Sequence, residues 1–259
     1  MPLPVPDISR NLFDLSGYCS IVTGAGQGIG LALAEALAYA GSDLVLTERN
    51  AEHLEAAARK IEAIGRKTAT VACDVTADDT PDRLVKAALD LCGRIDVLIN
   101  NAGFMTFADM LTVEDAVWDN IYAVNVRVPM RIMRAVLPVM VKAERGSVIN
   151  IGSSWSSRAS VFNQDGGGVD YCSSKAALQS LTRAARRMLR PRGCGSTPSP
   201  PARSIRRCTP ITAPSSSSTR NTFRSAVCNS QKISPARRSS SPRTPAATSP
   251  GRPCTSMAA

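Results

Sequence analysis

Two side chains that can move a proton lie four residues apart in the last well-patterned segment of the chain. Tyr171 and Lys175 belong to VDYCSSKAALQSLTRAARRML, whose apolar spacing predicts a helix, so they share one helix face. A phenol with a pKa of about 10 is a poor general base, but a neighbouring ammonium favours the phenolate. Ser153, which ends the apolar run SVINIGS, can hydrogen-bond the same substrate oxygen. These residue types predict proton transfer at an alcohol or carbonyl oxygen.

A glycine-rich segment, TGAGQGIG at residues 23–30, predicts a phosphate-binding loop. It lies between an expected strand and an expected helix, at the start of a β-α-β unit. Glycines allow a tight turn and a close backbone approach to a pyrophosphate, and the helix start offers free N–H groups. The position of the loop therefore favours a dinucleotide ligand over an ordinary glycine-rich turn.

The acidic residue expected about 20 positions after such a loop is Glu48, in DLVLTERN. A carboxylate at the end of this strand accepts a hydrogen bond from a ribose 2′-hydroxyl and repels a 2′-phosphate, which favours NAD. Arg49 directly follows and is suited to a 2′-phosphate, so NADP remains an alternative. Glu48 can also simply cap or solvate the following helix.

The segments that must position these residues alternate in character along the chain. Apolar, strand-like runs are followed each time by helix-like runs, and the expected helix at 118–143 is interrupted near Pro129. This alternation predicts a doubly wound parallel sheet, whose strands are apolar because helices cover both faces. The expected strands lie at 18–26, 43–50, 67–76, 95–103 and 146–153, and the expected helices at 29–41, 51–65, 79–93, 118–143 and 169–189.

From about Tyr18 to Gly193 the chain resembles the short-chain dehydrogenase/reductase family. The resemblance is carried, in the family's order, by TGAGQGIG, CDV, NNAG, VNV, INIGS and YCSSK. It implies a Rossmann-like α/β fold and hydride transfer between a nicotinamide cofactor and an alcohol or carbonyl substrate, with sugars, polyols and 3-oxoacyl groups among the candidates. The cofactor contacts that it implies are Thr23, Gly24, Gln27, Gly28, Ile29, Gly30, Glu48, Asp74, Val75, Asn101, Ala102, Gly103, Tyr171 and Lys175.

The resemblance also implies a catalytic tetrad of Asn125, Ser153, Tyr171 and Lys175. Tyr171 would be the acid/base, Ser153 would steady the substrate oxygen, Lys175 would hold the ribose hydroxyls and lower the tyrosine pKa, and Asn125 would anchor a water. Ser154 is the alternative to Ser153. The loop between Ser153 and Tyr171 is longer than the family's usual one, and because it borders the substrate site it bears on specificity.

Charge and cysteine content exclude several other classes of protein. Residues 194–259 hold ten of the 31 basic side chains and no acidic one, so the first 193 residues are neutral and the net charge of +10 says nothing about their ligand. The four cysteines of the first 193 residues lie far apart and lack metal or redox spacing, so we expect no metal and a reduced, cytoplasmic protein. Residues 1–17 lack signal-peptide features. We expect a homo-oligomer, as in the family, and neither a membrane nor a nucleic acid as partner.

The chain divides by composition into an N-terminal extension at 1–17, the dinucleotide-binding domain at 18–193 and a Ser/Pro/Arg-rich tail at 194–259. Where the family continues with further strands, hydrophobic periodicity ends. We therefore expect an irregular tail and a sheet without its last strands. A disordered basic tail that binds nucleic acid is one interpretation.

The genetic code supports a second interpretation, in which the tail is an out-of-frame translation. From Gly193 to Cys208, the adjacent reading frame permits V-R-V-N-A-I-S-P-G-P-I-D-T-P-M, which resembles the family's sixth strand and Pro-Gly turn. From Ser241 to Ala259, the same frame permits a segment ending V-D-G-G, which resembles the family's last strand. Met257 has only one codon, and its final G followed by the GC of the Ala258 codon must encode Gly in the adjacent frame. The loss of these strands would lower stability and activity, and would leave a catalytically inactive nucleotide-binding protein as an alternative function.

The coding DNA tests this interpretation directly. We expect codons 190–196 to contain the shift and the adjacent frame to encode the sixth strand and the Val-Asp-Gly-Gly end. Sequencing the gene is the measurement. A neighbouring frame that encodes neither segment would eliminate the hypothesis.

Overall fold

The computed structural model describes residues 13–157, 168–188 and 209–213, which all belong to one compact unit spanning residues 1–216. Strands and helices alternate along these residues as the apolar pattern predicts. The strands are β1 (Cys19–Thr23), β2 (Asp43–Glu48), β3 (Thr68–Ala72), β4 (Val97–Asn100), β5 (Ser147–Ser153) and β6 (Thr209–Ala213). The helices are α1 (Gly28–Tyr39), α2 (Ala51–Ala63), α3 (Thr80–Cys92), α4 (Asp115–Tyr122), α5 (Val128–Lys142) and α6 (Val169–Met188).

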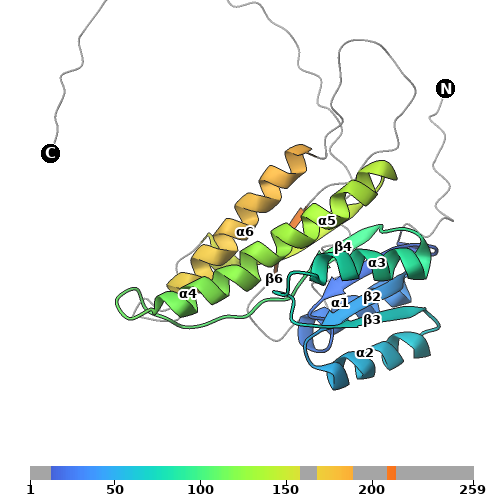
Figure 1. The fold of residues 1–259 in the computed structure, drawn as a ribbon, viewed down its shortest axis with the longest axis horizontal. Coiled ribbons are helices and arrows are strands. Elements are labelled where there is room, and N and C mark those ends of the chain that lie inside the picture. The colour runs from blue at the N-terminus through green and yellow to red at the C-terminus, as the bar shows by residue number, and fades with distance from the viewer. Residues whose placement is uncertain (1–12, 158–167, 189–208, 214–259) are drawn as a thin grey trace, which may run out of the picture. The chain divides into compact units, whose positions relative to one another are not determined.

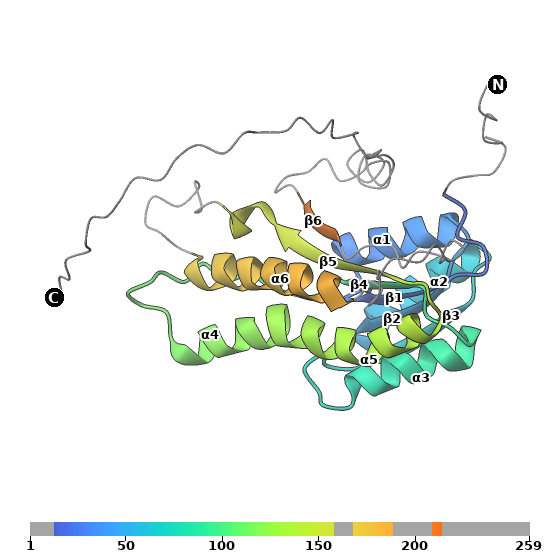
Figure 2. The same cartoon turned by 90° about the horizontal axis from the view of Figure 1, so that it is seen from above.

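The strands form one parallel sheet in the order β3-β2-β1-β4-β5-β6. The chain moves outward in one direction from β1 to β3 and then returns to build β4 and β5 on the other side of β1. Ligands bind at such a reversal, in the crevice beyond the carboxyl ends of the strands. Figures 1 and 2 show α1 and α2 on one face of the sheet and α3, α5 and α6 on the other. The predicted Rossmann-like α/β class is confirmed.

The interruption in the fourth expected helix lies earlier than Pro129. A π-helical turn at Ala123–Arg127 separates α4 from α5, and Pro129 stands in the first turn of α5, where its missing N–H is not needed. A π turn adds one residue to the helical repeat and is common at functional sites. The sequence pattern showed the proline but not this turn.

One short segment of the tail extends the sheet beyond β5. Thr209–Ala213 forms β6 and pairs with β5 in parallel, with Ile149 opposite Thr209 and Ser153 opposite Ala213. An unpaired strand edge offers N–H and C=O groups that any extended segment can satisfy, and a strand at the edge tolerates Pro210. The remainder of 194–259, like residues 158–167, lies outside the described residues, so the predicted domain boundaries and the reading-frame interpretation stay predictions.

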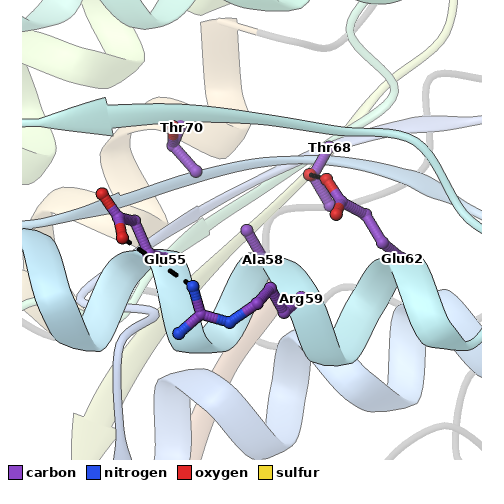
Figure 3. Close-up of a pocket in the computed structure, with 6 residues that line it drawn as sticks. All are labelled: Glu55, Ala58, Arg59, Glu62, Thr68 and Thr70. Carbon is purple, nitrogen blue, oxygen red and sulfur yellow. Dashed lines mark hydrogen bonds and ion pairs between the residues drawn. The ribbon is translucent and has the colours of Figure 1, made fainter.

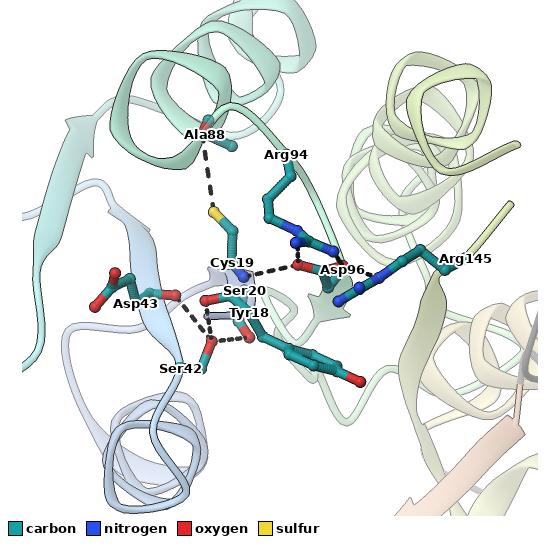
Figure 4. A network of polar contacts seen from close by, with 9 residues as sticks. All are labelled: Tyr18, Cys19, Ser20, Ser42, Asp43, Ala88, Arg94, Asp96 and Arg145. Atoms are coloured by element: carbon teal, nitrogen blue, oxygen red, sulfur yellow. Dashed lines mark hydrogen bonds and ion pairs between the residues drawn. The ribbon is translucent and has the colours of Figure 1, made fainter. Parts of the chain in front are cut away.

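A buried carboxylate fastens the amino-terminal edge of the sheet. Asp96 immediately precedes β4, and its side chain is 2% exposed. It accepts a hydrogen bond from the Cys19 backbone N–H at 3.0 Å, and its oxygens lie 2.7 Å from Nε of both Arg94 and Arg145 (Figure 4). The Arg145 guanidinium also lies over the Tyr18 ring, 4.6 Å from its centroid. Because Asp96 joins β1, β4 and the turn before β5 at the edge opposite the ligand crevice, its role is structural.

Replacing Asp96 with Ala should lower the free energy of unfolding by about 2–3 kcal/mol, because two guanidinium groups and a buried N–H lose their partner. This is below the full cost for a buried pair, since Arg94 and Arg145 are 35% and 39% exposed. Urea denaturation measures the effect. Asp90→Ala is the control: its ion pair with Lys86 is 63% and 75% exposed, so a loss within about 0.5 kcal/mol is expected. Equal losses in both variants would contradict this account.

Candidate active site

The predicted phosphate loop begins where β1 ends and is tied to the end of β4. The Thr23 hydroxyl accepts hydrogen bonds from the N–H groups of Asn101 and Ala102, both at 3.0 Å. The Asn101 side-chain amide donates in return to the carbonyl oxygens of Thr23 and Gly24, each at 3.0 Å. These four bonds bring together two motifs that are about 75 residues apart in the sequence. The loop and the NNAG segment therefore form one unit at the reversal of strand order.

The glycines of the loop are required by close backbone approaches. Gly24 has φ +64°, and a Cβ at Gly30 would lie 1.9 Å from the Gly24 carbonyl oxygen. Helix α1 begins at Gly28, and its N-cap residue Gln27 makes no side-chain cap. The first N–H groups of α1 are thus not used by a capping side chain, which suits a phosphate. Gln27, Gly28 and Ile29 are exposed on the first turn, so the loop fits the group that the sequence predicts.

The residues expected on the adenosine side lie at the ends of β2 and β3. Glu48 accepts a hydrogen bond from the Arg49 N–H at 2.8 Å, and a Cβ at Gly26 would lie 2.7 Å from Glu48 Cγ. Asp74 is exposed, and its Oδ1 accepts from the N–H and the hydroxyl of Thr76. These hydrogen bonds lower the pKa of Asp74, so its carboxylate stays ionised. Val75 instead packs against the core.

Lys175 is buried on α6 beside the end of β5. The residue is only 5% exposed, and its Nζ donates a hydrogen bond to the Ile151 carbonyl oxygen at 2.8 Å. Burial lowers the pKa of Lys175 to about 8. The ammonium lies 5.8 Å from the centroid of the Tyr171 ring, one helical turn earlier. The spacing prediction that Tyr171 and Lys175 share a face is confirmed by this contact.

In the protein without a cofactor, the pKa of Tyr171 is raised and not lowered. Burial raises the pKa of Tyr171, and a hydrogen bond with Ser153 opposes this rise to a smaller extent. Desolvation disfavours the phenolate, and the Lys175 ammonium is directed at Ile151. Ser153 itself is 9% exposed and accepts a hydrogen bond from the Trp155 N–H at 3.2 Å. The Ser153 hydroxyl is thus a polar neighbour of the Tyr171 hydroxyl.

Asn125 lies in the π turn and is 1% exposed. Its Oδ1 accepts from the Phe104 N–H at 3.2 Å, and its Nδ2 donates to the Phe104 carbonyl oxygen at 3.0 Å and to Ser174 Oγ at 3.1 Å. A Cβ at Gly103 would lie 2.9 Å from Asn125 Oδ1 and 3.5 Å from Lys175 Nζ. The Asn125 side chain therefore joins the NNAG segment to α6, and the backbone of Gly103 fits between Asn125 and Lys175.

A second buried polar chain fixes α6 on the sheet. Asn100 Nδ2 donates to Asn150 Oδ1 at 2.7 Å, across the β4–β5 pairing, and Asn150 Nδ2 donates to Thr182 Oγ1 at 2.8 Å. Thr182 lies two turns after Lys175 on the same side of α6. Buried amides that are hydrogen-bonded in this way set a unique register between helix and sheet. Sequence analysis gave no role to Asn150, which lies within INIGS, or to Thr182, which lies in no motif, because the type of neither residue shows that it will join helix and sheet.

Two aromatic side chains that carry no motif lie next to one another beside Tyr171. The Trp155 ring lies edge-on to the Tyr171 ring, with centroids 5.9 Å apart, and the Phe107 ring lies edge-on to Trp155 at 6.2 Å. Phe107 is 61% exposed. Trp155 therefore packs against the Tyr171 ring, and Phe107 packs against Trp155. Most of the long loop that follows Ser153 lies outside the described residues.

Other features of the described residues do not add chemistry to this site. A shallow groove between α2 and β3, lined by Glu55, Ala58, Arg59, Glu62, Thr68 and Thr70, carries an exposed ion pair and lies apart from the carboxyl edge (Figure 3). The only histidine, His53, is exposed on α2. Within 13–157, 168–188 and 209–213 there is no cluster of potential metal ligands, and no helix long and apolar enough to cross a membrane.

Comparison with known proteins identifies the family. The sequence profile of the family described as short chain dehydrogenase matches residues 19–195, so the chain belongs to that family. It is 39% identical over 173 residues to gluconate 5-dehydrogenase of Gluconobacter oxydans (strain 621H), covering 67% of this chain and 66% of that protein. The chain thus spans just under two thirds of the length of this relative.

Two solved structures are similar to the chain in fold and sequence. A metagenomic short-chain oxidoreductase in complex with NADP has a TM-score of 0.63 and 40% identity, covering 68% of this chain and 78% of that one. An NAD⁺-bound xylitol dehydrogenase has a TM-score of 0.62 and 31% identity, covering 68% and 66%. Members of this family therefore bind either NAD or NADP.

The buried amine of Lys175 should make stability depend on pH. Its pKa is about 8 in the folded protein and 10.5 in the unfolded chain. Between these values the unfolded chain binds more protons, so the free energy of unfolding rises with pH across this window, by up to about 3 kcal/mol. Lys175→Met should remove that rise in urea denaturation at pH 7.5 and 10.5.

Lys86→Met is the matched control, because the Lys86 side chain is 75% exposed. It should keep the pH dependence of the wild-type protein. An equal pH dependence in the wild-type and Lys175→Met proteins would show that the Lys175 amine is not desolvated.

Proposed function

We propose that the protein is a nicotinamide-dependent oxidoreductase that interconverts an alcohol and a carbonyl compound. The observation that supports this most strongly is the convergence of Ser153, Tyr171 and the buried Lys175 amine next to the NNAG segment. That segment is in turn bonded to the glycine-rich loop through Thr23. Proton-transfer groups and a phosphate cradle thus lie at the same, carboxyl edge of the sheet.

The roles that we propose follow from these contacts. Tyr171 holds the proton that is exchanged with the substrate oxygen, and Ser153 hydrogen-bonds the same oxygen. Lys175 is a buried hydrogen-bond donor, and its amine lies beside Gly103, the last residue of the NNAG segment. Because we propose that the cofactor binds at this segment, the amine can bind its ribose hydroxyls. Asn125 keeps the segment after β4 against α6. A nicotinamide bound at this edge supplies the hydride acceptor or donor, and the loop from Thr23 to Gly30 with Asp74 and Val75 would hold its nucleotide part.

We propose NAD as the cofactor, because Glu48 ends β2 beside Gly26 and its carboxylate repels a 2′-phosphate. Arg49 favours NADP and is the reason to test both. For the substrate we propose a sugar or polyol, supported by the names of two relatives, gluconate 5-dehydrogenase and xylitol dehydrogenase. We expect a cytoplasmic homo-oligomer, and, on the out-of-frame interpretation of residues 194–259, turnover below that of the relatives.

The decisive measurement is cofactor binding and turnover by the full chain. Titration with NADH and NADPH, followed by fluorescence, should show binding that is tighter for NADH. Absorbance at 340 nm should report NAD reduction with a panel of polyols and sugar acids. Tyr171→Phe should lower kcat by about 10²–10⁴ and keep binding, because it removes only the transferable proton. Gly30→Ala should abolish binding, since its Cβ would strike Gly24.

The outcomes separate the candidate functions. Binding with Tyr171-dependent turnover supports the proposal. Binding without turnover would identify a catalytically inactive nucleotide-binding protein, and restoring the adjacent reading frame after Gly193 would test whether the tail is the cause. Absence of binding would overturn the proposal. Salt-dependent nucleic-acid binding that is lost on deletion of 194–259 would instead support the basic-tail interpretation.

A further inference from the structure

The segment after β4 is bonded to the start of α6, although the two are about 60 residues apart in the sequence. The Thr106 hydroxyl donates a hydrogen bond to Asp170 Oδ2. The Gly168 N–H donates to the Ala108 carbonyl oxygen at 2.6 Å. On the other side, Asn125 binds both backbone groups of Phe104. Hydrogen bonds therefore hold the segment at 104–108 at every second residue, through Phe104, Thr106 and Ala108.

Asp170 is completely buried, and both of its carboxylate oxygens are hydrogen-bonded. Oδ2 accepts from Thr106, and Oδ1 accepts from the N–H of Tyr171 at 2.8 Å. Asp170 stands in the first turn of α6, where the free N–H groups favour a negative charge. A buried carboxylate is costly unless it is bonded in this way. The carboxylate thus links the segment after β4 directly to the backbone of the residue that carries the phenol.

The side chains next to these two residues contact one another through Trp155. Tyr171 follows Asp170 and packs on Trp155, while Phe107 follows Thr106 and packs on the same indole. The hydrogen bond and the ring contacts therefore close a circuit that runs through Thr106, Asp170, Tyr171, Trp155 and Phe107. A displacement of the segment after β4 would move the rings of Tyr171, Trp155 and Phe107 together.

We propose that Asp170 and Thr106 are positioning residues for Tyr171. Their hydrogen bond fixes the orientation of the phenol and the placement of Trp155 against it. This inference rests on the proposed function for its catalytic consequence, but the placement of Trp155 can be measured without turnover. The chain has two tryptophans, so Trp118→Phe leaves Trp155 as the single reporter.

The test uses substitutions of Thr106 in the Trp118→Phe protein. Thr106→Val removes the hydroxyl at nearly constant size, and Thr106→Ser keeps it. Thr106→Val should increase acrylamide quenching of Trp155 about twofold and red-shift its emission, because the indole loses its fixed contact with Tyr171. Thr106→Ser should restore both values. Thr112→Val, at an exposed threonine in the same stretch, is the matched control and should change neither.

Kinetics provide the second readout where the chain turns over. Thr106→Val should lower kcat about tenfold and leave the affinity for NADH unchanged, because a misplaced proton donor slows the chemical step only. Thr106→Ser should recover the wild-type kcat. A protein without turnover would count against the proposed function and leave the fluorescence result to decide the positioning role.

Two results would overturn the inference. Unchanged Trp155 quenching and emission in a folded Thr106→Val protein would show that the hydrogen bond does not position the rings. Equal changes in Thr106→Val and Thr106→Ser would show that packing at residue 106 matters and the hydroxyl does not. If Thr106→Val does not fold, Thr106→Ala serves instead: it also removes the hydroxyl that binds Asp170, so the same spectral change is expected.

Discussion

The hydroxyl of Thr23, with its two backbone hydrogen bonds to Asn101 and Ala102, is the contact on which the proposed site depends. It lies where the order of strands reverses, between β1 and β4, so it joins the first half of the sheet to the second. The glycine-rich loop takes its position from β1, and the NNAG segment takes its position from β4. Without this tie, the phosphate cradle and the proton-transfer groups would lie on two separately placed loops.

Side-chain amides hold α6 in place against the segment after β4 and against β5. Asn125 connects the backbone of Phe104 to Ser174, and Asn150 connects β5 to Thr182. Both amides are buried, and each bonds two different segments, so a shift of α6 would leave polar groups without partners. The helix that carries Tyr171 and Lys175 is thus fixed by polar contacts as well as by apolar packing.

Burial acts on the two proton carriers in opposite directions. It raises the pKa of Tyr171 and lowers the pKa of Lys175 to about 8, so the two values lie farther apart than in water, and their order is reversed. Both groups are disfavoured in their charged forms, which is consistent with the proposed role of Tyr171 as a neutral phenol that gives its proton. The opposite edge of the sheet shows a contrasting arrangement, where the buried Asp96 carboxyl group lies between two arginines.

The sequence by itself determined the class of fold and most of the candidate site. The strand–helix alternation, the glycines after β1 and the four-residue spacing of Tyr171 and Lys175 are local patterns, and periodicity and backbone geometry make them legible without a structure. Only the tertiary structure decided that Asp170 is buried against Thr106, that the helical break falls at Ala123–Arg127, and that Thr209–Ala213 pairs with β5. Each of these features depends on contacts between segments that are far apart in the sequence. The residues around Asp170, Ala123–Arg127 and Thr209–Ala213 do not by themselves show which segments they will contact.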